Sequence, residues 1–207
     1  MTHIMYNVKR RRNTGPKQGT RMKVTREQVA ANRERIMEAA GTLFRKHGFD
    51  GIGVADIMKA AGLTHGGFYG HFASKEDLAA EACAHATRDP WAAWLDAPPE
   101  QRLEGVVRSY LTPRHRDDRT HGCLFAALGS DIVRQPRTVR HAFTERFRSK
   151  IDVLRRLVTG RSAAARRDKA LATMAGLVGA LILSRAVDDP RLSEDILEAA
   201  ATTFARM

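Results

Sequence analysis

Residues 61–78 read AGLTHGGFYGHFASKEDL, and they contain the most informative pattern in the chain. Gly62 is suited to the positive φ of a tight turn, which separates one short helix from the next. Apolar residues recur at helical spacing before this turn, and the spacing predicts helices over 54–61 and 65–71. Two short helices joined by a glycine-containing turn are typical of a helix-turn-helix.

Three glycines, Gly66, Gly67 and Gly70, lie within the second of these helices. Each costs about 1 kcal/mol relative to alanine inside a helix, so stability alone would not favour them. Glycine allows the backbone to approach another body closely, and the floor of a DNA groove is such a body. The alternative is a loop with helix-like spacing, and the spacing leaves both open.

The sequence on either side of this stretch is also helical. Thr25-Arg26-Glu27-Gln28 has the pattern of a capping box, and Gly48 is a natural left-handed stop, which together predict a helix over 26–47. Thr64 is expected to cap the helix after it, and Ser74-Lys75-Glu76-Asp77 opens a fourth helix that continues to about residue 88.

Later segments show helical spacing at about 100–111, 122–133, 136–159, 163–187 and 191–205. No alternating apolar run bounded by hairpin turns predicts a strand. The chain is therefore expected to be all-α. We predict three parts: a basic disordered arm over 1–24, a helix-turn-helix domain over 25–72 and a second helical domain over 73–207.

The composition is that of a soluble globular protein, with 43% hydrophobic and 28% charged residues among 207. The longest uncharged run, Ala170 to Ser184, is shorter than the roughly 20 apolar residues that span a bilayer. Only Cys83 and Cys123 are present, and no apolar stretch follows the basic N-terminus, so we expect a cytoplasmic protein. No phosphate loop, nucleophile elbow or paired metal-ligand motif predicts an enzyme, a cofactor or a metal site.

The net charge of +12 suggests a polyanionic partner, although charged runs are often only solvated faces. Residues 1–24 contain seven Lys and Arg and no acid. This arm is expected either to contact DNA beside the main site or to be an added segment, since Met22 is an alternative start. Residues 101–167 contain sixteen Lys and Arg against six acids.

Four segments resemble the N-terminal domain of regulators of the tetracycline-repressor (TetR) family, over about residues 26–80. They are Gly48-Phe49-Asp50-Gly51, Val54-Ala55-Asp56-Ile57, Ala61-Gly62-Leu63-Thr64 and Gly67-Phe68-Tyr69-Gly70-His71-Phe72-Ala73-Ser74-Lys75-Glu76-Asp77-Leu78. One departure is Gly53, where the family commonly has Thr or Ser. It weakens the cap of the second helix and removes one phosphate contact.

The resemblance implies a role for seven residues. Those expected to touch DNA phosphates are Thr64, Tyr69, His71 and Lys75, and those expected to face base edges are His65, Gly66 and Gly67. The residue types agree with these roles, because hydroxyls and a lysine at a helix N-terminus are good phosphate partners. Phe68 and Phe72 are expected to pack inward.

The resemblance also implies a homodimer on a pseudo-palindromic DNA operator, in which the last two helices pair across a two-fold axis. Two apolar faces suit this pairing, although they suit the chain's own core equally well: Leu171, Met174, Leu177, Val178 and Leu181, and then Ile196, Leu197, Ala200 and Phe204. Gly176 and Gly179 would allow close approach.

A small-molecule effector would lie among the central helices and release the repressor from DNA. The candidate pocket residues are Trp91, Trp94, Tyr110, Cys123, Phe125, Leu128, Phe143 and Phe147. Plain core packing is the alternative for each aromatic. The arginine excess over 101–167 points to an anionic effector.

Three other functions remain open. Cys123 with His115 or His121 would make a thiol- or metal-responsive regulator of the same fold. The same residues would supply the nucleophile and base of an enzyme. A helical interaction module with a basic arm would bind nucleic acid without sequence preference and with steep salt dependence.

Overall fold

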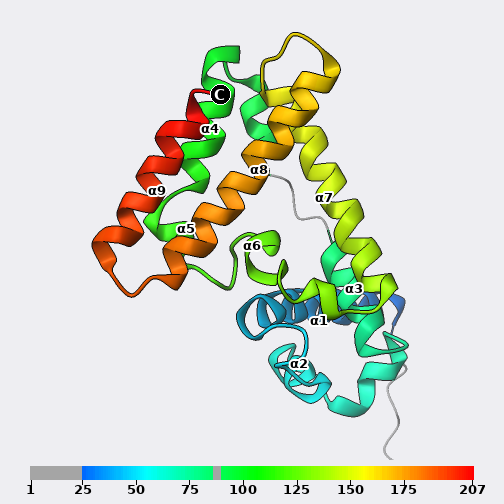
Figure 1. Ribbon diagram of the computed structural model, residues 1–207. Helices are drawn as coiled ribbons and strands as arrows, with labels where there is room; N and C mark the ends of the chain where they lie inside the picture. The colour runs from blue at the N-terminus through cyan, green and yellow to red at the C-terminus, as the bar shows by residue number, and fades with distance from the viewer. Residues whose placement is uncertain (1–24, 86–89) are drawn as a thin grey trace, which may run out of the picture.

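A computed structural model describes residues 25–85 and 90–207, and within these ranges it contains helices and no strand (Figure 1). The all-α prediction is confirmed for this part of the chain. The predicted arm lies outside the described residues. The fourth predicted helix ends at Ala84, earlier than expected, because His85 is already non-helical, and residues 86–88 of its predicted range are not described. The elements are α1 (Arg26–His47), α2 (Val54–Ala60), the 3-10 helix η1 (His65–Gly70), α3 (Lys75–Ala84), η2 (Pro90–Asp96), α4 (Pro99–Tyr110), α5 (Pro113–Asp117), α6 (Leu124–Leu128), η3 (Ile132–Arg134), α7 (Arg137–Leu157), α8 (Ala163–Ala186) and α9 (Pro190–Ala205).

The first helix has the predicted bounds because its caps are local. The Thr25 hydroxyl accepts from the Gln28 N–H at 3.1 Å, and Gly48 ends the helix with a φ of 75°. At α3 the Ser74 hydroxyl accepts from the Asp77 N–H at 3.1 Å. The Asp77 carboxylate then accepts from the Ala73 N–H, so the box closes one residue earlier than the pattern predicts.

The prediction of one helix over 122–133 is wrong. This segment forms α6 and η3, separated at Gly129 and Ser130, two residues of modest helix propensity. Leu128 and Ile132, on either side of the break, are both buried in the core that contains α1, α2 and α3. The break therefore turns α6 and η3 toward the N-terminal helices.

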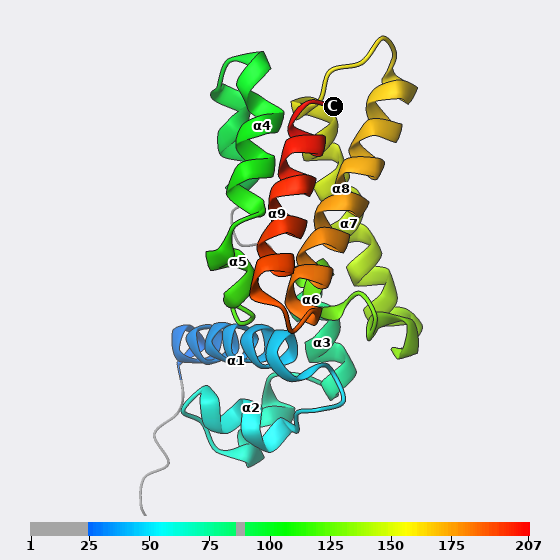
Figure 2. The same cartoon turned by 60° about the vertical axis from the view of Figure 1, so that its left-hand side comes forward.

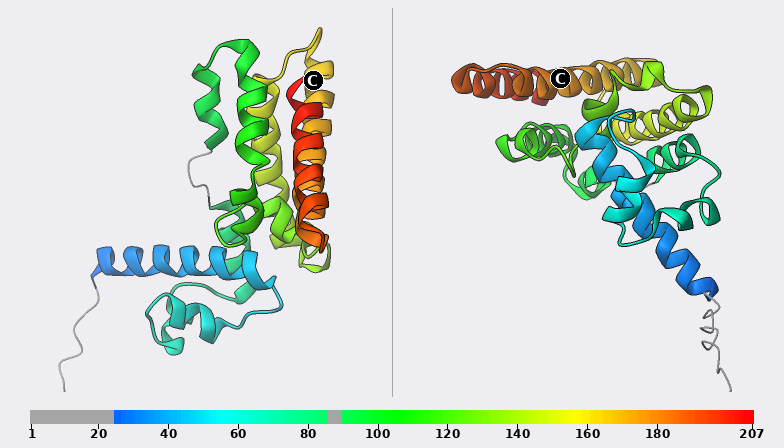
Figure 3. Two further views of the ribbon diagram at one scale, coloured as in Figure 1. Left: turned by 90° about the vertical axis from the view of Figure 1, so that its left-hand side faces the viewer. Right: turned by 90° about the horizontal axis from the view of Figure 1, so that it is seen from below.

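The helices form two layers. α4, α7, α8 and α9 run upright as a bundle, and α1 lies crosswise below it with α2 and η1 beneath (Figures 1, 2 and 3). α3 packs along α7 and contributes Leu78, Ala79 and Cys83 to the core of α1, α2 and η1. The domain boundary after residue 72 stays a prediction, and the lower core continues beyond it.

α8 packs between α7 and α9 in the bundle. By length and composition alone it is apolar enough to cross a membrane. Four of the nine residues predicted to pair across a two-fold axis are buried in the chain's own core: Met174, Leu177, Leu181 and Leu197 are at most 4% exposed. Gly176 serves the same core, because a Cβ there would lie 1.9 Å from the Phe204 ring. Leu171, Val178, Ile196, Ala200 and Phe204 are partly buried against it.

Candidate nucleic-acid interface and ligand cavity

The turn between α2 and η1 positions the candidate DNA-reading helix. Gly62 has a φ of 69°, as its place in the sequence predicts, and the Leu63 N–H donates to the Met58 carbonyl at 2.9 Å. Phe68 and Phe72 are buried and stack with ring centroids 5.8 Å apart. These two rings anchor η1, so its opposite face is turned outward.

That outward face contains most of the predicted DNA-contacting residues. Tyr69 is 71% exposed, and Thr64, His65, Gly66 and Gly67 are exposed as well. Thr64 is the N-cap residue of η1, as predicted, but its side chain makes no capping bond, and its backbone carbonyl accepts from the Gly67 N–H at 3.0 Å. The Thr64 hydroxyl is therefore available to a phosphate.

The glycines of η1 are not required by the protein's own packing. A Cβ at Gly66 or Gly70 would meet no atom within 4 Å, and at Gly67 the nearest atom is the Met58 Cε at 3.7 Å. Gly48 and Gly62 are the only positive-φ glycines among the described residues, so backbone conformation does not require glycine in η1 either. The missing side chains leave space only on the outer surface.

The two remaining predicted contacts, His71 and Lys75, lie beside this surface and are partly buried. The His71 Nδ1 is buried and has no hydrogen-bond partner within the described residues. Lys75 is the first residue of α3, where its ammonium group and the helix N-terminus both suit an anion. Gly53 precedes α2 without a side-chain cap, as its identity predicts.

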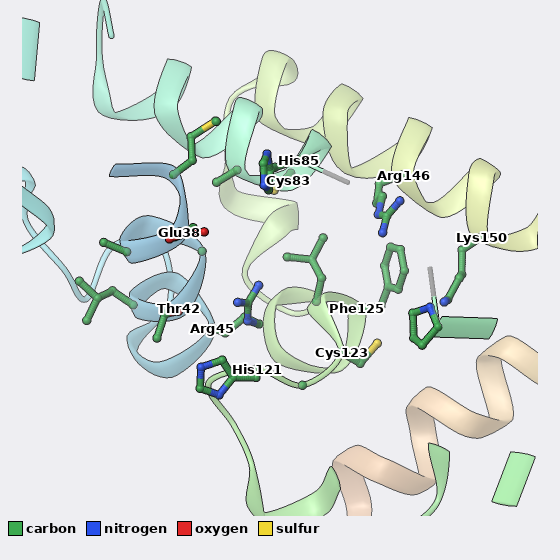
Figure 4. A pocket seen from close by; sticks show the side chains of 18 of the residues that line it. Glu38, Thr42, Arg45, Cys83, His85, His121, Cys123, Phe125, Arg146 and Lys150 are labelled. Carbon is green, nitrogen blue, oxygen red and sulfur yellow. The ribbon is translucent and has the colours of Figure 1, made fainter. Parts of the chain in front are cut away.

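A cavity of about 940 Å³ lies where α1 meets the upper bundle. Its walls come from α1, α3, η2, the end of α4, the loop before α6, α6 itself and α7. Figure 4 shows Thr42 and Arg45 of α1 on one side and Arg146 and Lys150 of α7 on the other, with Phe125 between them. The cavity therefore joins the helix-turn-helix part to the bundle.

Four of the eight predicted pocket residues line this cavity: Trp91, Tyr110, Cys123 and Phe125. The other four do not line it, because each is used in packing. Trp94 covers Gly105, Leu128 is buried in the lower core, and Phe143 and Phe147 pack edge-on against Phe125.

Sequence reasoning missed the polar walls of the cavity. Arg45 lies in the last turn of α1, and its Nε donates to the Thr120 carbonyl at 2.6 Å. Asp118 holds that loop by accepting from the Thr120 and His121 backbone N–H groups, both at 3.0 Å. These bonds keep the pKa of Asp118 well below its ordinary value. The sequence signal was limited to the arginine excess.

His115 is fully engaged inside the protein. Its Nδ1 lies 2.7 Å from the Tyr110 carbonyl, and its Nε2 accepts from the Cys123 backbone N–H at 3.1 Å. Both ring nitrogens are occupied, so His115 ligates no metal and activates no Cys123 thiol without breaking these bonds. The geometry thus opposes the metal-site and the nucleophile–base alternatives for His115.

The two cysteines differ in environment, and we expect alkylation to distinguish them. Burial raises the pKa of the Cys83 thiol to about 12, with Arg45 opposing the rise. At pH 8 only about one Cys83 in 10⁴ would be a thiolate. Iodoacetamide followed by mass spectrometry should modify the partly exposed Cys123 and spare Cys83. Equal labelling of both would contradict this assignment.

The same alkylation tests the thiol-responsive alternative. Loss of DNA binding in the alkylated wild type, with the treated Cys123→Ser variant unaffected, would support it. Labelling of Cys123 with unchanged DNA affinity would leave this residue a packing role.

Residues 36–82 match the family model of the bacterial regulatory proteins, tetR family. The chain is 37% identical over 57 residues to the HTH-type transcriptional regulator AcrR of Shigella flexneri, covering 28% of this chain and 26% of that one. It is 33% identical over 84 residues to the HTH-type transcriptional repressor KstR2 of Mycobacterium tuberculosis (strain CDC 1551 / Oshkosh), covering 38% and 42%. These alignments span less than half of the curated relatives' length.

The similarity of the whole fold extends further than that of the sequence. A crystal structure of a TetR transcriptional regulator from Chloroflexus aurantiacus J-10-FL superposes with a TM-score of 0.70, covering 87% of this chain and 95% of that one at 23% identity. The likeness includes the helix-turn-helix and the bundle above it. The match over residues 36–82 identifies the helix-turn-helix part of the chain as a domain of the tetR family of bacterial regulatory proteins, and the chain as a whole has the fold of a TetR transcriptional regulator.

Proposed function

We propose that the chain is a dimeric transcriptional repressor that binds a pseudo-palindromic operator through η1 and leaves it when a small molecule enters the cavity. The observation that carries the DNA-binding part is the outer face of η1. The space beside its three glycines is not required for the protein's own packing, and it lies next to the exposed Thr64 and Tyr69 side chains. A DNA backbone or groove floor would use that space. The relative KstR2 is named as a transcriptional repressor, which favours repression over activation for this chain.

The surface of α8 and α9 favours the dimer. After the core residues are set aside, α8 still presents Ala172, Ala175, Ile182 and Leu183 to the outside, and α9 presents Leu192. Ile182 is 41% and Leu183 is 57% exposed, and a Cβ at Gly179 would meet no atom within 4 Å. Small and apolar residues at spacings of three and four allow a second copy to approach closely.

The position of the cavity favours release by a bound molecule. Arg45 belongs to α1, which packs against α2 of the helix-turn-helix, and its guanidinium bonds to the loop before α6. A ligand between α1 and α7 would contact both layers at once. If the ligand binds more tightly when the two layers are displaced than when they are arranged for DNA binding, its binding lowers operator affinity. The ratio of the ligand's two affinities sets the size of this decrease.

Gel shifts with three variants test the assignment of η1 and α3. Tyr69→Phe and Lys75→Ala should each weaken binding about tenfold on every operator sequence, because phosphate contacts position without specifying. His65→Ala should instead change which sequence is preferred, since its side chain is expected to reach base edges.

The salt dependence provides the control for these gel shifts. Lys75→Ala should reduce the slope of log affinity against log salt by about 1, whereas Tyr69→Phe should leave it unchanged. If Lys75→Ala switched sequence preference and kept full affinity, the proposed placement of η1 on DNA would be wrong.

A further inference from the structure

The charged side chains around the cavity are mainly basic. Arg35 and Arg45 come from α1 and Arg146 and Lys150 from α7, and Glu38 is the one acid among the described lining residues. Arg35 and Glu38 are exposed, while Arg45, Arg146 and Lys150 are partly buried. The inner part of the cavity is therefore positively charged.

Two of these cations have no acidic partner among the residues that the structure describes. Arg45 donates to a backbone carbonyl, and within the described residues neither it nor Arg146 forms an ion pair. Burial lowers the pKa of Arg45, and Asp118 raises it by a smaller amount. An arginine stays protonated under these conditions. A bound anion would supply the counter-charge that such a partly buried guanidinium lacks.

Tyr110 adds a hydrogen-bond donor to the same cavity. The residue is 5% exposed, and its buried hydroxyl forms no hydrogen bond of ordinary geometry within the described residues, although the Cys123 thiol lies next to it. Burial, together with the neighbouring Cys123, raises the pKa of Tyr110 well above its ordinary value, so the phenol keeps its proton. Buried hydroxyls are normally paired, and an acceptor on a ligand would satisfy this one.

The rest of the lining suits an aromatic body. Trp91 meets Tyr110 edge-on with centroids 5.6 Å apart, and His115 meets Tyr110 edge-on at 4.5 Å. The Lys150 ammonium lies 3.7 Å from the centroid of the Trp91 ring. Phe125 separates Arg45 from Arg146 (Figure 4). A volume of about 940 Å³ is in the range of small-molecule sites.

We propose that the cavity binds a small aromatic carboxylate, with its acid group at Arg146 and its ring against Trp91 and Phe125. The Tyr110 hydroxyl donates to an acceptor of the same ligand. This inference rests on the proposed function, whose effector it assigns to a chemical class. A neutral ligand would leave the Arg146 guanidinium without a counter-charge, and a cationic ligand would be repelled by it.

The test uses three probes of nearly the same shape and different charge: 2-naphthoate, 2-naphthamide and 2-naphthylmethylammonium. Calorimetric titration into the full chain should give naphthoate an affinity at least tenfold higher than that of the amide, with the ammonium weakest. Arg146→Gln should lower naphthoate affinity about tenfold and leave the amide unchanged. Tyr110→Phe should weaken naphthoate and the amide alike, about threefold, because both have an acceptor oxygen.

Arg148→Gln is the matched control. Arg148 lies two residues further along α7, is exposed and pairs with Glu145, so its loss should leave all three affinities unchanged. Melting temperatures of both variants separate a lost contact from a lost fold. If no probe binds at 1 mM, if the amide equals naphthoate, or if the two glutamine variants behave alike, the inference is overturned.

Different results would overturn the proposed function and the proposed anion site. Naphthoate binding that leaves operator affinity unchanged would remove the release mechanism and keep the anion site. Equal binding of acid and amide, with operator binding intact, would overturn the anion site and keep the DNA-binding function.

Discussion

Gly66→Leu is expected to lower operator affinity about a hundredfold, or about 2.8 kcal/mol, without weakening the fold. The space that a side chain would occupy at Gly66 is empty in the free protein. A leucine there fills the gap that the proposed DNA groove uses, and it favours the helix by up to about 1 kcal/mol. Gel shifts should therefore show the loss while thermal melting shows an unchanged or slightly higher melting temperature.

Gly62→Leu is the matched control for this effect. Gly62 has a φ of 69°, which side-chain-bearing residues rarely adopt, so the variant should melt at a lower temperature. The two leucines thus separate loss of DNA contact from loss of fold. Wild-type operator affinity in Gly66→Leu would contradict the placement of η1 against DNA.

The double variant Ile182→Glu with Leu183→Glu is expected to convert the proposed dimer into a monomer. Both side chains are exposed on the outer face of α8, so the charges cost the isolated chain little. At the proposed two-fold interface they would be buried unpaired and close to their symmetry copies, which costs several kcal/mol. Light scattering should report half the mass of the wild type. Operator affinity should fall at least a hundredfold, because one half-site then binds alone.

Val133→Glu controls for a charge placed on any exposed apolar residue. Val133 is 66% exposed and lies in η3, away from α8 and α9. It should leave mass and affinity unchanged. A double glutamate variant of α8 that remains dimeric would show that this face is not the interface.

Local chemistry explains which elements were predictable. Thr25 and Gly48 define α1 because both caps act within one helical turn, and Gly62 defines the turn before η1 because no other residue adopts its φ as easily. The exposure of the η1 face follows from Phe68 and Phe72, whose spacing already indicates the buried side. The family resemblance added the roles of particular residues on that face, and these stay predictions.

Tertiary packing explains what could not be predicted. Helical periodicity identified the apolar face of α8, but it cannot tell whether Met174 and Leu181 contact α9 or a second chain. Arg45 and Arg146 are about a hundred positions apart in the sequence, and only the fold brings them to one cavity. Conversely, Trp94 was predicted to line the pocket, but its ring packs against Gly105 and is not part of the cavity wall.

Selection of bound duplexes from random DNA by the purified wild-type chain tests sequence-specific recognition by η1. We expect enrichment of one pseudo-palindromic sequence whose half-site centres are about 34–36 Å apart, one turn of the double helix. Gly66→Leu should fail to enrich it under the same salt conditions. Enrichment of no sequence, with binding that only decreases as salt is raised, would contradict sequence-specific recognition by η1.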